Sequence, residues 1–97
     1  MSAAFNVIAT LIAKPGQQHT LESLLRGLLE PNRQEAGCEQ YDLHQDLQHP
    51  ETFYMLERWR DDAALGDHDQ SAHIQSFRAK AADVLAHFEL KRLKFLA

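Results

Sequence analysis

Hydrophobic and polar residues recur along the chain with two periods, one typical of strands and one of helices. Residues 5–13, FNVIATLIA, are rich in the residue types that favour strands. Both faces of this segment are largely apolar, so we expect both to be covered. The next segment carries leucines at 21, 24, 25, 28 and 29, the spacing of an amphipathic helix. We place that helix at 17–30 and expect Pro31 to end it.

Four more elements follow this helix. The alternating, aromatic-rich segments after Gly37 predict a hairpin with a polar turn that contains Pro50. Asp61 with Asp62, and then Ser71, are residues that cap helices. The last apolar positions alternate with basic ones, which indicates an edge strand. We expect strands at 38–45, 52–59 and 88–95, and a helix in two pieces that begin near residues 63 and 72.

The order of these elements predicts the fold. It is strand, helix, strand, strand, helix, strand, and it indicates an α+β, ferredoxin-like β-α-β-β-α-β domain with an antiparallel sheet and helices on one face. Residues 1–97 would form one domain. Because the first strand is apolar on both faces, the face without helices needs another cover. A second copy of the chain is the simplest cover, so we expect a homodimer packed sheet against sheet.

Composition narrows the function. A net charge of −4 over 97 residues argues against a nucleic-acid partner, which favours a basic surface. No apolar run approaches the roughly 18–20 residues of a membrane helix, and the first positive charge, Lys14, follows the apolar run instead of preceding it. We therefore expect a cytoplasmic protein without membrane insertion. A single cysteine, Cys38, excludes an internal disulfide framework.

Glu57 is the first candidate for chemistry. It lies two residues from Trp59 and from Met55, so all three project from one face of the predicted strand. An ionised carboxylate on an apolar face needs a partner. That partner is either an arginine of a second copy or a polar pocket, and the sequence leaves both open. Trp59 suits a packed core as well as a pocket wall.

His68 and His73 flank the break between the two predicted helix pieces. Their spacing of five differs from the i, i+4 pair of helical zinc sites, so we expect no metal. Each is either a capping or surface histidine, or a base or hydrogen-bond donor in a pocket. The sequence has no phosphate-binding glycine loop, nucleophile elbow, or flavin or nicotinamide motif, so we expect no cofactor.

Three motifs together resemble a known family. They are Gly37-Cys38-(two residues)-Tyr41, Phe53-(three residues)-Glu57-Arg58-Trp59, and Ala64-Leu65-(two residues)-His68-(four residues)-His73. In this order the chain resembles the antibiotic biosynthesis monooxygenase family over nearly its whole length. It is most similar to small bacterial quinol monooxygenases and to the autoinducer-processing isomerase once grouped with them.

The resemblance implies a dimeric α/β barrel built from two ferredoxin-like chains. It also implies oxidation of a small aromatic or quinol substrate by molecular oxygen, without metal, flavin or haem. Two other functions remain open: an isomerase or proton-transfer enzyme for a small polar metabolite, and a non-catalytic dimer that binds a small ligand. The positions that match the family are His73, His68 and Glu57 as catalytic residues, and Trp59, Tyr41 and Asn6 as substrate-binding residues.

Overall fold

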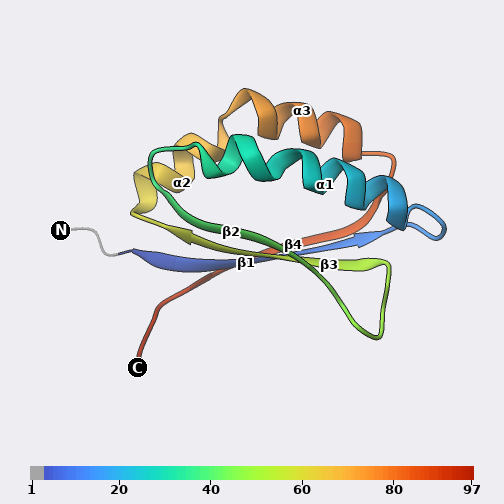
Figure 1. Ribbon diagram of the computed structural model, residues 1–97, viewed down its shortest axis with the longest axis horizontal. Helices are drawn as coiled ribbons and strands as arrows, with labels where there is room; N and C mark the ends of the chain where they lie inside the picture. The colour runs from blue at the N-terminus through green and yellow to red at the C-terminus, as the bar shows by residue number, and fades with distance from the viewer. Residues whose placement is uncertain (1–3) are drawn as a thin grey trace.

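The computed structural model describes residues 4–97 as an antiparallel four-stranded sheet with three helices on one face (Figure 1). This confirms the α+β, ferredoxin-like order, with the second helix in two pieces. The elements are β1 (Phe5–Ala13), α1 (Gln18–Arg33), β2 (Cys38–Gln45), β3 (Thr52–Trp59), α2 (Asp62–Asp69), α3 (Ala72–Ala81) and β4 (Leu85–Leu93).

The sheet has the strand order β2-β3-β1-β4, so the most apolar strand, β1, lies inside it. Val7 of β1 lies opposite Glu57 of β3, and Leu11 lies between Phe53 of β3 and Phe88 of β4. Since paired residues project to the same side of a sheet, these side chains share the face that the helices cover. Burial alternates along β1 accordingly.

Helix α1 confirms the leucine pattern but not the predicted end. Leu21, Leu25 and Leu28 are buried, and the helix continues through Pro31 to Arg33. The prediction that Pro31 ends the helix was wrong. Proline removes one backbone donor, and in the last turn this loss leaves the following bonds intact, as the N–H of Gln34 still donates to the carbonyl of Glu30 at 3.1 Å.

Both predicted helix caps are confirmed. The side chain of Asp61 accepts the N–H of Ala64, and that of Ser71 accepts the N–H of Ile74. These caps satisfy backbone donors that have no partner inside the helix. The Ser71 cap also fixes where α3 begins after the end of α2.

Strand β4 begins and ends earlier than the predicted 88–95. Its backbone pairs with β1 from Leu85, opposite Ala13, to Leu93, opposite Asn6. It remains the least covered part of the sheet: Phe88 and Leu90, which face the helix side, are 53% and 41% exposed. On the opposite face of the sheet, Ile8 and Ile12 are half-buried. Within residues 4–97, no helix is both long and apolar enough to pass through a membrane.

Candidate active site

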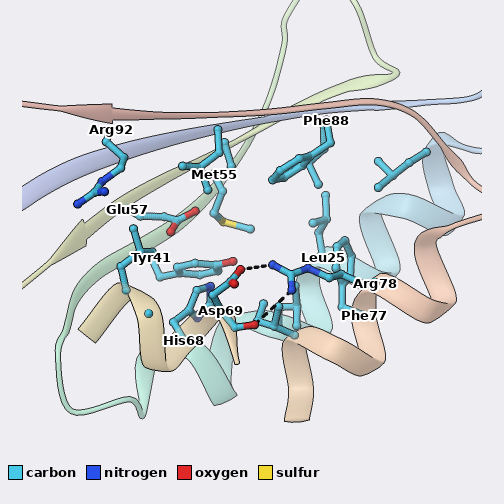
Figure 2. Close-up of a pocket in the computed structure, with 18 of the residues that line it drawn as sticks. Leu25, Tyr41, Met55, Glu57, His68, Asp69, Phe77, Arg78, Phe88 and Arg92 are labelled. Carbon is cyan, nitrogen blue, oxygen red and sulfur yellow. Dashed lines mark hydrogen bonds and ion pairs between the residues drawn. The ribbon is translucent and has the colours of Figure 1, made fainter. Parts of the chain in front are cut away.

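A cavity of about 620 Å³ lies between the sheet and the helices. Its walls are mostly apolar and come from all three helices and from the helix-side face of all four strands (Figure 2). Phe88 and Leu90 belong to the wall on the β4 side, and because both are partly exposed the cavity reaches the edge of the sheet. A small apolar ligand therefore has both a lined chamber and a way in.

Three buried groups capable of acid–base chemistry line this cavity: Tyr41 of β2, Glu57 of β3 and His68 of α2. Tyr41 lies directly opposite Glu57 in the β2–β3 pairing. The three side chains gather at one end of the cavity, whereas Phe77 and Phe88 lie at the other (Figure 2). The site thus has a polar end and an apolar end.

Glu57 is 4% exposed. Trp59, itself fully buried, donates its indole N–H to Oε1 of Glu57 at 2.8 Å. Burial raises the pKa of Glu57 to about 7, although the hydrogen bond from Trp59 works in the opposite direction. The carboxyl group can therefore gain or lose a proton near neutral pH, as a general acid or base must.

Tyr41 and His68 are held in their neutral forms. Burial raises the pKa of Tyr41 far above its ordinary value, so the phenol keeps its proton and can donate a hydrogen bond. Burial lowers the pKa of His68, against the opposing effect of the Glu35 carboxylate. A neutral imidazole has a free lone pair, and this ring packs against Trp59 with the centroids 4.5 Å apart.

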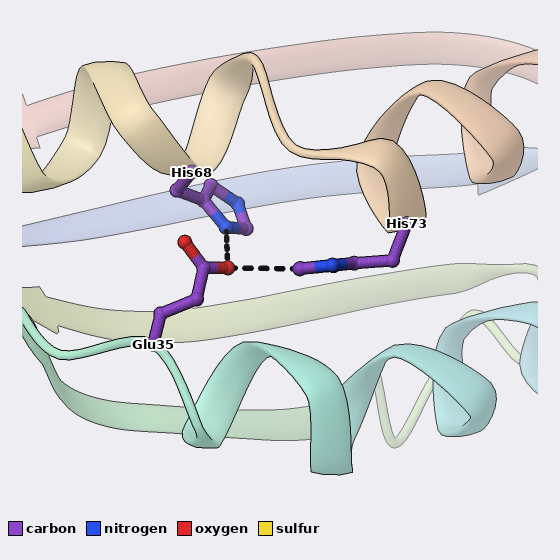
Figure 3. A group of neighbouring side chains, drawn as sticks. All are labelled: Glu35, His68 and His73. Carbon is purple, nitrogen blue, oxygen red and sulfur yellow. Dashed lines mark hydrogen bonds and ion pairs between the residues drawn. The ribbon is translucent and has the colours of Figure 1, made fainter.

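Glu35, in the connection between α1 and β2, joins the two predicted histidines (Figure 3). Its Oε2 lies 2.7 Å from Nδ1 of His68 and 2.9 Å from Nε2 of His73. Within residues 4–97 these three residues form the group whose donor atoms are close enough, within 4.8 Å, to be considered for a metal ion. In the structure Nδ1 of His68 and Nε2 of His73 both lie at hydrogen-bond distance from Oε2 of Glu35.

The other predicted site residues lie outside the cavity wall. Trp59 is behind Glu57 in the core. His73 lines a separate groove between α1 and α3. Asn6 projects from the opposite face of the sheet, where its side-chain oxygen is 3.3 Å from Nη1 of Arg58. In the single chain, therefore, three of the six predicted residues meet at the cavity.

Sequence reasoning missed Glu35 and the charged residues at the cavity rim. Arg78 pairs with Asp69, and Arg92 pairs with Asp62; all four line the cavity. The exposed acidic and basic side chains of this rim resemble an ordinary solvated surface in the sequence. No periodic pattern marks Glu35 either, since it lies in a connection between elements.

A ferredoxin-like domain with an apolar cavity and buried acid–base groups at one end has the shape of a small-molecule site. Residues 4–80 match the profile of the antibiotic biosynthesis monooxygenase family. The chain belongs to this family, as its sequence motifs indicated.

Individual relatives agree with this assignment. The chain is 37% identical to YcnE of Bacillus subtilis over 78 residues, which cover 80% of this chain and 82% of YcnE. The crystal structure of PA3566 from Pseudomonas aeruginosa matches with a TM-score of 0.95 and 45% identity, covering 100% of this chain and 98% of that one. The structure of Rv0793 from Mycobacterium tuberculosis matches with a TM-score of 0.91 and 29% identity, covering 98% and 97% of the two chains.

Proposed function

We propose that this protein is a monooxygenase that oxidises a small aromatic or quinol substrate with molecular oxygen and needs no metal, flavin or haem. The observation that carries the proposal is the apolar cavity with Tyr41, Glu57 and His68 at one end. The family supports oxygenation as the reaction class, and both YcnE and Rv0793 are named as monooxygenases.

The cavity favours a ring with a hydroxyl group at one edge. Its apolar walls, among them Met55, Phe77 and Phe88, would contact the ring, and its volume of about 620 Å³ has room for one or two fused rings. The hydroxyl would then lie at the polar end, within reach of the three acid–base groups. Neutral phenols and hydroquinones have this distribution of apolar and polar surface.

The chemistry starts with removal of the hydroxyl proton by a base of the cavity. The phenol of Tyr41 donates a hydrogen bond to the resulting oxyanion. The electron-rich anion transfers one electron to oxygen, and the two radicals combine through a new carbon–oxygen bond. Cleavage of the oxygen–oxygen bond with loss of water leaves one oxygen atom in the product and the other in the water.

A homodimer is part of this proposal. On the sheet face without helices, Ile8, Ile12 and Leu56 remain half-buried in the single chain, and Leu93 is 37% exposed. A second sheet packed there would cover these apolar side chains. Sedimentation at micromolar concentration should give a dimer, and Leu56→Glu should shift it towards the monomer. A wild-type chain that sediments as a monomer would contradict the dimer, and with it the barrel of two chains.

The decisive experiment measures oxygen consumption with a panel of phenols and of benzene and naphthalene hydroquinones, in buffer treated with a chelator. We expect turnover, with one atom of ¹⁸O from labelled oxygen in the product. Product that forms equally well without oxygen would refute the monooxygenase and favour an isomerase or other proton-transfer enzyme. Tight binding of a ring compound without any turnover would favour the non-catalytic binding protein.

A further inference from the structure

Glu35, His68 and His73 come from three different segments and share one carboxylate oxygen. Oε2 of Glu35 is 2.7 Å from Nδ1 of His68 and 2.9 Å from Nε2 of His73 (Figure 3). The two side chains of the shorter contact are 9% and 17% exposed. Hydrogen bonds to a charged group in such partly buried surroundings are among the strong ones. Together they tie the connection after α1 to the junction of α2 and α3.

These contacts determine which nitrogen of His68 carries its proton. A carboxylate can only accept hydrogen bonds, so Nδ1 of a neutral His68 must be the N–H donor. The lone pair then belongs to Nε2. The ring of His68 lines the cavity, and the hydrogen bonds found among residues 4–97 leave its Nε2 without a partner. Nε2 is therefore the ring nitrogen available to a ligand.

We propose that Glu35 and His68 act as a carboxylate–imidazole dyad, in which Nε2 of His68 takes the proton from the substrate hydroxyl. This rests on the proposed function and assigns the base within it. The carboxylate keeps the imidazole in the productive tautomer and stabilises the imidazolium that forms, as in Ser-His-Asp triads. Glu57 in its protonated form, whose Oε1 accepts from Trp59, and Tyr41 then donate hydrogen bonds to the substrate anion.

His73 is a positioning residue in this arrangement. It lines the groove between α1 and α3 and not the cavity, so it acts through Glu35. Ser71 strengthens the same junction, because its hydroxyl donates to the carbonyl of His68 at 2.7 Å and lies 3.2 Å from Nε2 of His73. Loss of His73 leaves Glu35 with its shorter bond to His68, and should therefore have a smaller effect than loss of Glu35.

The first test reads the tautomer directly and needs no substrate. Long-range proton–nitrogen NMR of protein labelled at histidine, with His68→Gln to assign the signals, should show His68 with its proton on Nδ1. Glu35, His73, Asp69 and Tyr41 are the titratable groups around this ring. Because burial lowers the pKa of His68, its imidazole is neutral near pH 7, and the spectrum is recorded there. Glu35→Ala should return His68 to a mixture of tautomers. A wild-type His68 that carries its proton on Nε2 would overturn the dyad.

The second test uses turnover of a hydroquinone from the panel. General-base catalysis contributes about 10²–10⁴-fold, so we expect Glu35→Ala to lower kcat by at least about 10²-fold with little change in KM. Glu35→Gln keeps the shape without the charge and should also lower kcat, whereas His73→Gln should lower it by about 10-fold or less. The control is Glu30→Gln, an exposed α1 side chain whose contact is with Gln34, and it should leave kcat unchanged.

The outcomes separate the dyad from the proposed function. If the wild type oxidises no phenol or hydroquinone of the panel, the monooxygenase proposal fails, while the tautomer of His68 still decides the dyad. If the wild type is active, and Glu35→Gln and Glu35→Ala, folded by circular dichroism, keep the wild-type kcat, the dyad is wrong. In that case Glu57 becomes the base.

Discussion

Replacing Glu57 with glutamine tests how much the buried carboxyl group lowers the free energy of unfolding. Burial raises its pKa from the ordinary 4.5 to about 7. The unfolded chain therefore ionises this group near pH 4.5 and the folded chain only near pH 7, so the folded state loses stability as the pH rises between these values. At about 1.4 kcal/mol for each tenfold change in the ionisation constant, the loss reaches about 3 kcal/mol above pH 7.

Glutamine has nearly the same shape, can still accept the indole N–H of Trp59, and does not ionise. The assay is urea unfolding at a fixed protein concentration and several pH values. Relative to the wild type, Glu57→Gln should gain about 1 kcal/mol at pH 5 and about 3 kcal/mol at pH 8, added to a constant offset. With His68 as the base, the same variant should keep most of its turnover, because the glutamine amide can still donate a hydrogen bond to the substrate anion.

The matched control is Glu39→Gln on the neighbouring strand. That carboxylate is 43% exposed and pairs with Arg58, and exposed pairs contribute about 1 kcal/mol or less. Its effect on stability should be small at both pH values. A stability difference between Glu57→Gln and the wild type that stays constant from pH 5 to pH 8 would refute the reasoning, because burial would then not hold the carboxyl group in its protonated form.

Two other predictions concern the packing around the site. Trp59→Phe removes the N–H that donates to Glu57 at 2.8 Å, so the pKa of Glu57 should rise further; ¹³C NMR of the carboxyl group measures it, and an unchanged or lower value contradicts the prediction. Gly37→Ala would place a methyl group 2.2 Å from Cβ of Ala64 and should cost about 1–3 kcal/mol or more in urea unfolding. Gly27→Ala in α1 meets nothing within 4 Å and should stabilise by about 1 kcal/mol; equal losses in both glycine variants would show that the contact with Ala64 is unimportant.

Much of the fold follows from local patterns. The leucines of α1 recur with the spacing of a helix, and the apolar residues of β3 alternate as in a strand. Each pattern therefore identifies the buried face of its element. Asp61 and Ser71 mark helix starts through hydrogen bonds to residues three positions ahead. The end of α1 escaped prediction, because a proline in a last turn loses a single bond, and the sequence does not show how strongly the packed leucines hold the helix together.

The site was less accessible to sequence reasoning. Glu57 stood out because a carboxylate among apolar neighbours needs a partner, and its partner is Trp59, two residues away on the same strand face. Glu35 could not be found this way, since its contact with His68 joins residues 33 apart, one in the connection after α1 and one in α2. Because side chains alternate along β1, Asn6 projects to the face opposite to Val7 and the cavity. A substrate role for Asn6 stays a prediction.

The cavity borders on the least buried strand of the sheet. Phe88 and Leu90 of β4 help to form its wall while they remain 53% and 41% exposed. Substitutions at exposed positions usually change stability little, so these two side chains can be replaced by larger or smaller ones at low cost to folding. The side chains of Tyr41, Glu57 and His68 are buried, so substitutions there cost much more stability. Under the proposed function, substitutions along this edge would change which rings fit the cavity and leave the acid–base groups in place.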